Sequence, residues 1–128
     1  EEAVHRAILE QNDGRYLKGD FAAESHGVLA LEENARETTV WLQTEYIEFT
    51  WDGQRLADAG GGSNPVLLRF RNDDGVYLLT EYRFTREGEA FGLDFEAHFP
   101  FTVSAYDRIT ETAGWPMKLA QSCYAQAV

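Results

Sequence analysis

The chain has 128 residues, of which 44% are hydrophobic and 13% aromatic, so it can bury the core of one domain (1–128) and is not a disordered segment. Twenty-two acidic residues against eleven basic ones give a formal net charge of −11, which disfavours nucleic acid and anionic lipid as partners. The single cysteine, Cys123, excludes an intramolecular disulfide and a zinc site built from several cysteines.

No apolar run is long enough to span a membrane, and no signal peptide is present. We therefore expect no direct membrane insertion by this segment. The sequence begins at Glu1 without a methionine, so we expect a processed or trimmed piece of a longer protein, with any signal or anchor upstream.

A helix is expected over residues 1–17. Val4, Ala7 and Ile8 share an apolar side that can cover a sheet. Residues 12–14, Asn-Asp-Gly, interrupt the pattern, so the helix either frays or ends there. His5, which lies among the polar residues, is expected to be a surface residue.

Two long strands are expected next, over residues 21–32 and 38–51. The first places Phe21, Ala23, Gly27, Leu29 and Leu31 on one side. The second carries large apolar groups on both faces, with Trp41, Phe49 and Trp51 on one of them. Such a strand is central or covered by helices on its second side.

Asp52-Gly53 is typical of a two-residue hairpin turn, followed by a short return strand over residues 54–59. The glycine run at residues 60–65 lacks the Lys-Ser/Thr of a phosphate-binding loop, so it predicts a flexible loop or a bulge.

The clearest signal is a β-hairpin of residues 66–71 and 76–84 around Asn72-Asp73-Asp74-Gly75. Its alternation predicts one core-facing side, with Arg69 and Arg71 on the opposite side. The core-facing residues expected are Val66, Leu68, Phe70, Val76, Leu78, Thr80, Tyr82 and Phe84. The turn lacks the spacing of acids that a calcium loop needs.

Helices are expected over residues 91–99 and 117–128, with a turn or helix over 104–112 between them. Cys123 lies on the apolar side of the last helix and is expected to be buried. The fold class predicted is α+β: an N-terminal helix, a four-to-five-stranded antiparallel meander, and C-terminal helices packing on the sheet. A cone of the cystatin or NTF2-like type is one possible architecture.

Glu24 and His26 lie two residues apart on one face of the first strand, where they can form an acid–base pair or half of a metal site. Two polar groups on a solvated strand face are the simpler interpretation. With Glu81 they are the candidate ligand-binding residues. No catalytic constellation, metal site or cofactor motif is found in the sequence.

Three segments resemble a known family: the N-terminal helix with RYLKGDFAAESHGVLALEE, the stretch VLLRFRNDDGVYLLTEYRFTREGEAFGLDFEAHFP, and the closing helix LAQSCYAQAV. Together they resemble a poorly characterised extracytoplasmic domain of Gram-positive Firmicutes. It occurs as small secreted or lipid-anchored proteins and as the outer segment of membrane metallopeptidases that look like β-lactam sensors. Residues 24–26 (Glu-Ser-His) and 79–82 (Leu-Thr-Glu-Tyr) carry most of the resemblance.

The zinc-binding HExxH sequence of such peptidases is absent, so the resemblance does not extend to peptidase activity. It implies a location outside the membrane and a signalling role. The leading hypothesis is a non-catalytic extracytoplasmic module that senses or binds an unknown protein or small molecule. The alternative is a ligand-binding or enzymatic cone-shaped domain with a pocket lined by aromatic residues.

Overall fold

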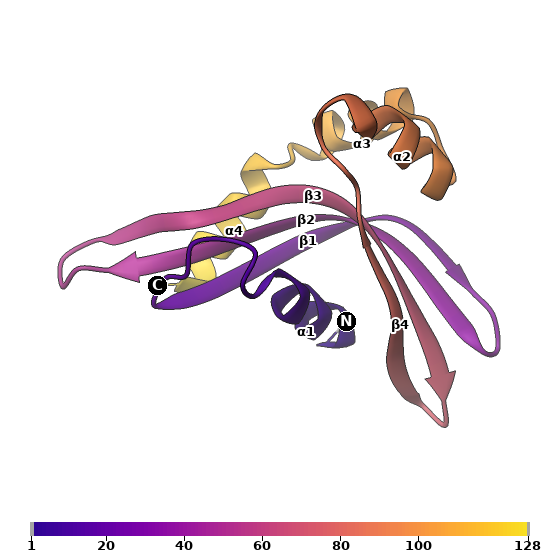
Figure 1. Cartoon of the computed structure of the whole chain (residues 1–128), viewed down its shortest axis with the longest axis horizontal. Helices are drawn as coiled ribbons and strands as arrows, with labels where there is room; N and C mark the ends of the chain where they lie inside the picture. Colours follow the sequence, from indigo (N-terminus) through magenta and orange to yellow (C-terminus); the bar gives the residue numbers. More distant parts are fainter. Residues whose placement is uncertain (1, 128) are drawn as a thin grey trace.

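Four antiparallel strands form an open sheet in the order β1–β2–β3–β4, so each strand pairs with its neighbour in sequence. The computed structural model describes residues 2–127. Its elements are α1 (Glu2–Asn12), β1 (Phe21–Glu33), β2 (Glu37–Trp51), β3 (Leu56–Asp73), β4 (Val76–Phe84), the 3₁₀ turn η1 (Gly88–Ala90), α2 (Phe91–His98), α3 (Val103–Ala113) and α4 (Met117–Ala127). The predicted α+β class is confirmed (Figure 1).

One face of the sheet is covered by α1. Ala7 and Ile8 of this helix are buried against the central strands, as the apolar side of the helix predicted. The helix ends at Asn12, whose side-chain amide donates to the carbonyl oxygen of Ile8 at 2.9 Å. It does not continue to Leu17, which is 78% exposed.

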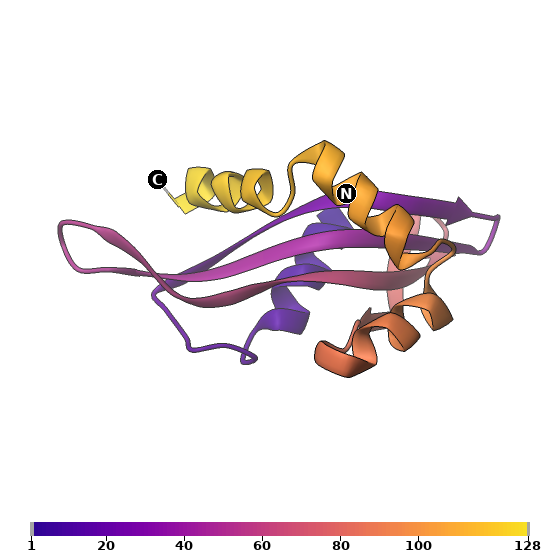
Figure 2. The same ribbon diagram turned by 90° about the horizontal axis from the view of Figure 1, so that it is seen from above.

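The three C-terminal helices lie on the opposite side of the sheet (Figures 1 and 2). Phe95 of α2 and Phe99, the residue after this helix, pack against Trp41 and Leu67. The two-sided apolar pattern of β2 therefore has the expected explanation. At the other end of the sheet, α4 buries Cys123 against Phe49. Burial of Cys123 is therefore confirmed. No helix within residues 2–127 is long and apolar enough to cross a membrane.

The glycine run is part of a strand and not the flexible loop that was one of its two predicted forms. β3 continues through residues 60–65, with the register shift of a bulge where Glu48 pairs with Gly60 but Phe49 pairs with Asp58. A Cβ at Gly61 would lie 2.0 Å from the carbonyl oxygen of Tyr46. The close approach of two backbones explains why glycine occupies this position.

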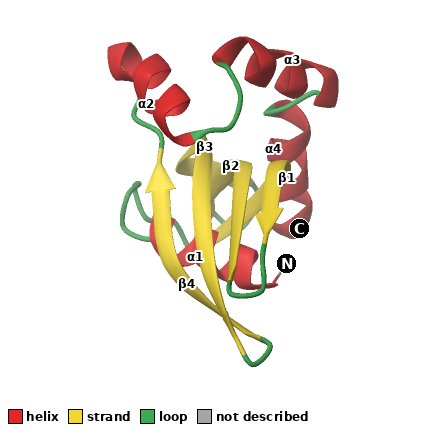
Figure 3. Ribbon diagram, turned by 90° about the vertical axis from the view of Figure 1, so that its right-hand side faces the viewer, coloured by secondary structure: helices red, strands yellow, loops and turns green. Residues whose placement is uncertain are grey.

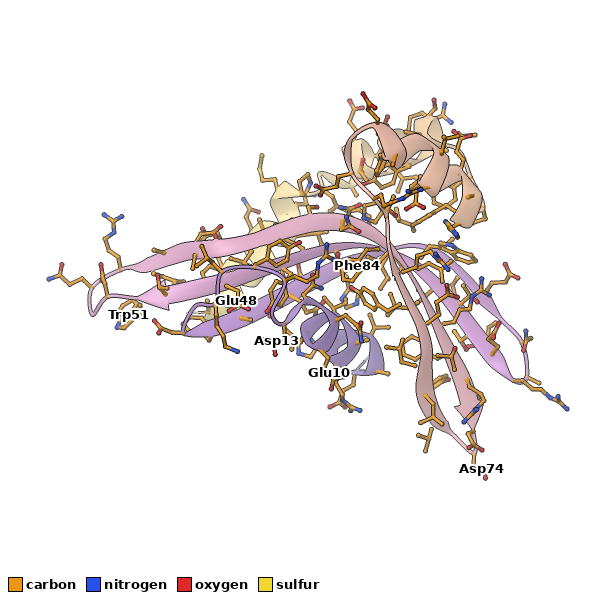
Figure 4. The ribbon with its side chains drawn as sticks, in the orientation of Figure 1. Glu10, Asp13, Glu48, Trp51, Asp74 and Phe84 are labelled. Atoms are coloured by element: carbon orange, nitrogen blue, oxygen red, sulfur yellow. The ribbon has the colours of Figure 1, made fainter. Side chains whose placement is uncertain are left out.

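The two predicted hairpin turns differ in outcome. Asp74 and Gly75 have φ of 49° and 81° between the paired residues Asp73 and Val76. The hairpin predicted around residues 72–75 is confirmed, and its turn is only two residues long. The Asp52 turn is longer than predicted, because Trp51 pairs with Leu56. The Asp52 carboxylate accepts hydrogen bonds from the backbone N–H groups of residues 54 and 55. Trp51, expected to be covered, is 54% exposed on this hairpin (Figure 4).

In both edge strands, β1 and β4, a bulge makes the residues on each face differ from those predicted. In β4 the register shifts at Thr80, so Val76 and Leu78 leave the side of Tyr82 and Phe84. Tyr77 and Leu79 take their place on the α1 side, where Leu79 packs on the core. In β1 a shift lies between Val28 and Ala30, so Leu29 and Leu31 face opposite sides of the sheet.

Candidate functional site

A cavity of about 260 Å³ lies on the α1 side of the sheet, and we call it the α1-side cavity. It is bounded by the first turn of α1 and by the strands that lead to the β1–β2 and β3–β4 turns (Figure 3). Its apolar walls are Ala3, Val4, Val28, Leu31, Val40, Leu42 and Phe70. Its remaining lining residues are His26, Glu33, Thr38 and Tyr77. All four strands and α1 therefore contribute to one largely apolar cavity.

The bulge in β1 decides which residues reach this cavity. Val28 pairs with Leu42, but beyond the bulge Ala30 pairs with Trp41, so the alternation is shifted by one residue. Leu31 and Glu33 consequently face the α1 side, whereas an uninterrupted strand would have turned Glu32 to that side. The carboxylate at the cavity therefore belongs to Glu33.

Three polar side chains form the mouth of the cavity near the turns. Glu33 and Thr38 are direct partners across β1 and β2, and Tyr77 approaches from β4. Thr38 is only 9% exposed, yet its Oγ1 has no hydrogen-bond partner within the described part of the chain. Buried hydroxyl groups without a partner are rare because desolvation is not compensated. The oxygen itself has almost no accessible surface, so a ligand in the cavity reaches it only when the Thr38 side chain turns about χ1.

Glu24 lies beside the inner end of the cavity and binds two histidines. Its carboxylate oxygens are 2.6 Å from Nδ1 of His5 and 2.7 Å from Nδ1 of His26. The Glu24 side chain is 4% exposed, so two partners offset much of the cost of burying a carboxylate. Since His5 belongs to α1, the cluster holds this helix to β1. The simpler interpretation of Glu24 and His26 as groups on a solvated face is wrong.

The third predicted site residue, Glu81, is not brought to this place. It pairs with Arg69, which the register puts on the face opposite α1. Burial alone would raise the pKa of Glu81, but hydrogen bonds from Arg83 and Arg69 outweigh it and hold this pKa below its usual value. Their guanidinium Nε atoms lie 3.0 and 2.8 Å from the carboxylate. Glu81 thus belongs to a surface ion-pair cluster.

A second cavity of about 250 Å³ lies on the opposite face, and polar side chains that line it form hydrogen bonds with one another. The Gln43 amide donates to Ser63 Oγ and accepts from the Tyr106 hydroxyl. The pKa of Tyr106 is raised to about 12, chiefly by burial. Asn64 is held by the backbone of Thr85 at both ends of its amide. These groups stabilise the layer of helices, in contrast to the unpartnered Thr38.

Nucleophilic and metal chemistry find little support in these residues. Burial raises the pKa of Cys123 to about 11, so its thiol stays protonated at neutral pH. Within residues 2–127, no three His, Cys, Asp or Glu side chains are arranged to hold a metal ion. The Glu24 carboxylate is shared by two imidazoles, which makes it a structural connection between α1 and the sheet.

Sequence reasoning placed Glu24 and His26 together but missed His5, Glu33 and Thr38. The contact of His5 with Glu24 joins residues nineteen positions apart in two different elements, and the position of Glu33 depends on a bulge in β1. The only available signal was the position of Glu33 and Thr38 on either side of a short turn. No family model, curated protein or solved structure matches the chain.

Proposed function

We propose that this domain is a non-catalytic extracytoplasmic module that binds a small, largely apolar ligand in the α1-side cavity. The observation that carries the proposal is the buried, unpartnered hydroxyl group of Thr38 in the wall of a largely apolar cavity. Ligand sites combine apolar walls with a few polar groups that fix orientation. Thr38 supplies such a group, and Val40 and Phe70 supply apolar wall beside it.

The dimensions of the cavity define the size and affinity of the ligand. A volume of about 260 Å³ is slightly below that of sites for drug-sized molecules, so the ligand is small. Burying about 200 Å² of apolar ligand surface gives about 5 kcal/mol, part of which is lost to association entropy. We therefore expect dissociation constants of roughly 1 mM or weaker for simple probes.

The extracytoplasmic location is supported by the resemblance of residues 24–26 and 79–82 to the Firmicute domain. A module outside the membrane that binds a small molecule suits a sensing role in a membrane-associated signalling protein. The gene sequence upstream of Glu1 tests the location. An export signal or membrane anchor there supports it, and a gene that starts near Glu1 without either contradicts it.

Binding is tested with 1-hexanol, a neutral probe with a short apolar chain, followed by NMR of the backbone amides. We expect saturable shifts at Val40, Leu42 and Phe70, whose side chains line the cavity. Val28→Trp should weaken binding about tenfold or more, because the larger indole would fill part of the cavity. Val28 is 54% exposed, so the protein should tolerate this substitution.

The matched control is Val76→Trp, at a position that is 58% exposed on the opposite face of the sheet. It should leave the affinity for 1-hexanol within about twofold, since surface changes away from a site have small effects. Equal loss in both variants, or saturable shifts confined to other parts of the sheet, would contradict the assignment of this cavity as the ligand site.

A further inference from the structure

The mouth of the α1-side cavity has a charge that the proposed function does not itself explain. The Glu33 side chain is exposed and takes part in none of the ion pairs formed within residues 2–127. It lies across the strand pair from Thr38, whose hydroxyl oxygen is buried without a partner. An exposed carboxylate at the opening therefore lies across the strand pair from a buried hydroxyl oxygen that has no partner in the described part of the chain.

Basic residues of the neighbouring strands do not neutralise this carboxylate. Arg69 and Arg83 lie on the opposite face, where both bind Glu81. Arg71 follows the same face, because it pairs with Glu37, one residue before Thr38. The formal net charge of −11 adds a long-range field of the same sign. Arg36, in the turn between β1 and β2, is exposed and also forms no ion pair with Glu33 in the described part of the chain. The Glu33 carboxylate therefore keeps its charge and can accept a cation.

Aromatic rings complete the opening. The rings of Phe70 and Tyr77 meet edge to face, with their centroids 6.4 Å apart, and both residues line the cavity. The face of an aromatic ring attracts a cation through its quadrupole, most strongly when the site is partly shielded from water. Carboxylate, hydroxyl oxygen and aromatic rings together are the groups that bind an ammonium ion.

We propose that the ligand of the α1-side cavity is an amphiphilic cation, an ammonium group on a short apolar chain. This inference rests on the proposed function and names its ligand class. The ammonium group binds Glu33 at the mouth and donates a hydrogen bond to Thr38 Oγ1 once the Thr38 side chain has turned toward it. The apolar chain lies against Val40 and Leu42 and ends near His26.

The same geometry ranks other head groups below the ammonium. An alcohol can hydrogen-bond to Thr38 but gains nothing from the charge of Glu33. A carboxylate head group meets the like charge of Glu33 in the same opening, which disfavours it. For the same apolar chain, the amine should therefore bind most tightly, the alcohol less tightly and the carboxylate least tightly.

The test compares hexylamine, 1-hexanol and hexanoate at pH 7 by NMR titration. Hexylamine should bind the unmodified protein roughly tenfold tighter than 1-hexanol, the effect of one charge-assisted hydrogen bond. In Glu33→Gln this advantage should disappear while the affinity for 1-hexanol changes less than about twofold. Thr38→Val should weaken hexylamine and 1-hexanol alike, because both use the hydroxyl oxygen.

The control is Glu32→Gln, which removes the same charge from the adjacent residue on the other face of β1. It should change the affinity for hexylamine by less than about twofold, since only screened, distant charge is removed. Thermal unfolding verifies that each variant is folded. If Glu32→Gln and Glu33→Gln weaken hexylamine equally, net charge alone attracts the amine and the assigned site is wrong.

The outcomes separate this inference from the proposed function. If all three probes bind in the cavity with equal affinity, the cation preference is overturned and the binding function stands. If none of them gives saturable shifts at the cavity residues, the proposed function fails and the ligand class fails with it. A preference for hexylamine that is lost only in Glu33→Gln supports both.

Discussion

At the scale of single residues, two buried oxygens in the described chain lack a hydrogen-bond partner: Thr38 Oγ1 and Glu45 Oε2. The first belongs to a residue that lines the α1-side cavity and is assigned to a ligand. The second belongs to a carboxyl group on the opposite face, beside Ser63. Burial raises the pKa of Glu45, a hydrogen bond with Ser63 opposes this, and the charge of Asp58 adds to the increase.

This raised pKa gives a pH-dependent stability. The folded protein holds the Glu45 proton more tightly than the unfolded chain, so the contribution is fully favourable below the ordinary pKa of 4.5. It is lost as the pH rises through the higher folded pKa. Glu45→Gln, which cannot ionise, should therefore stabilise the protein at pH 7 more than at pH 4, by at most about 1 kcal/mol because the group is only partly buried.

Urea unfolding at the two pH values measures this difference. Glu32→Gln, which removes an exposed carboxylate, is the control and should have a small effect that is nearly the same at pH 7 and pH 4. If Glu45→Gln changes the free energy of unfolding equally at both pH values, the pKa of Glu45 is not raised by its surroundings in the folded protein.

At the scale of elements, the strands were predictable where alternation is uninterrupted. Val66, Leu68 and Phe70 alternate with arginines, and the structure buries all three on the α1 side. Of the three bulges, the one at residues 58–60 adjoins the glycine run, where a bulge was one of the two predicted forms. Those at residues 28–30 and 79–81 were not predictable, because one extra residue changes the face of a strand without changing its composition. The candidate site depends on these two bulges, which is why Glu33 was missed and Tyr77 was known only as one of several aromatic residues that could line a pocket.

The hairpin register can be tested directly in β3. Leu68 is fully buried, and Leu68→Ala should lower the free energy of unfolding by about 2–5 kcal/mol through lost burial and a cavity. Arg69, next to it, points to the other face and pairs with Glu81 and Glu37. Arg69→Ala should cost no more than about 1 kcal/mol, as exposed ion pairs do. Similar losses in denaturant unfolding would mean that the faces of β3 are assigned wrongly.

At the scale of the whole molecule, β2 is the element that both layers of helices share. Its side chains alternate between the cluster under α1, which contains Val40 and Leu42, and the cluster under α2, which contains Trp41. The two-sided pattern of this strand predicted helices on both faces. The polar connection through His5 and Glu24 was not predictable, since it depends on how α1 lies across the sheet.

Because one strand belongs to both cores, the two layers should unfold together. Ile8 of α1 and Phe95 of α2 are each fully buried, on opposite faces. We expect Ile8→Ala to lower the free energy of unfolding by about 2–5 kcal/mol and Phe95→Ala by about 3–5 kcal/mol. Each variant should keep a single transition, followed by far-UV circular dichroism and by tryptophan fluorescence.

Trp41 makes the fluorescence probe local to the α2 side, where its indole N–H donates to the carbonyl oxygen of His98 at 2.8 Å. The other two tryptophans, Trp51 and Trp115, can be replaced by Phe so that only Trp41 reports. In Ile8→Ala, whose change is on the far face, the Trp41 signal should shift to the same lower midpoint as the circular dichroism. A fluorescence midpoint that stays at its original value would show that the α2 layer is stable without α1 and that β2 does not couple the two faces.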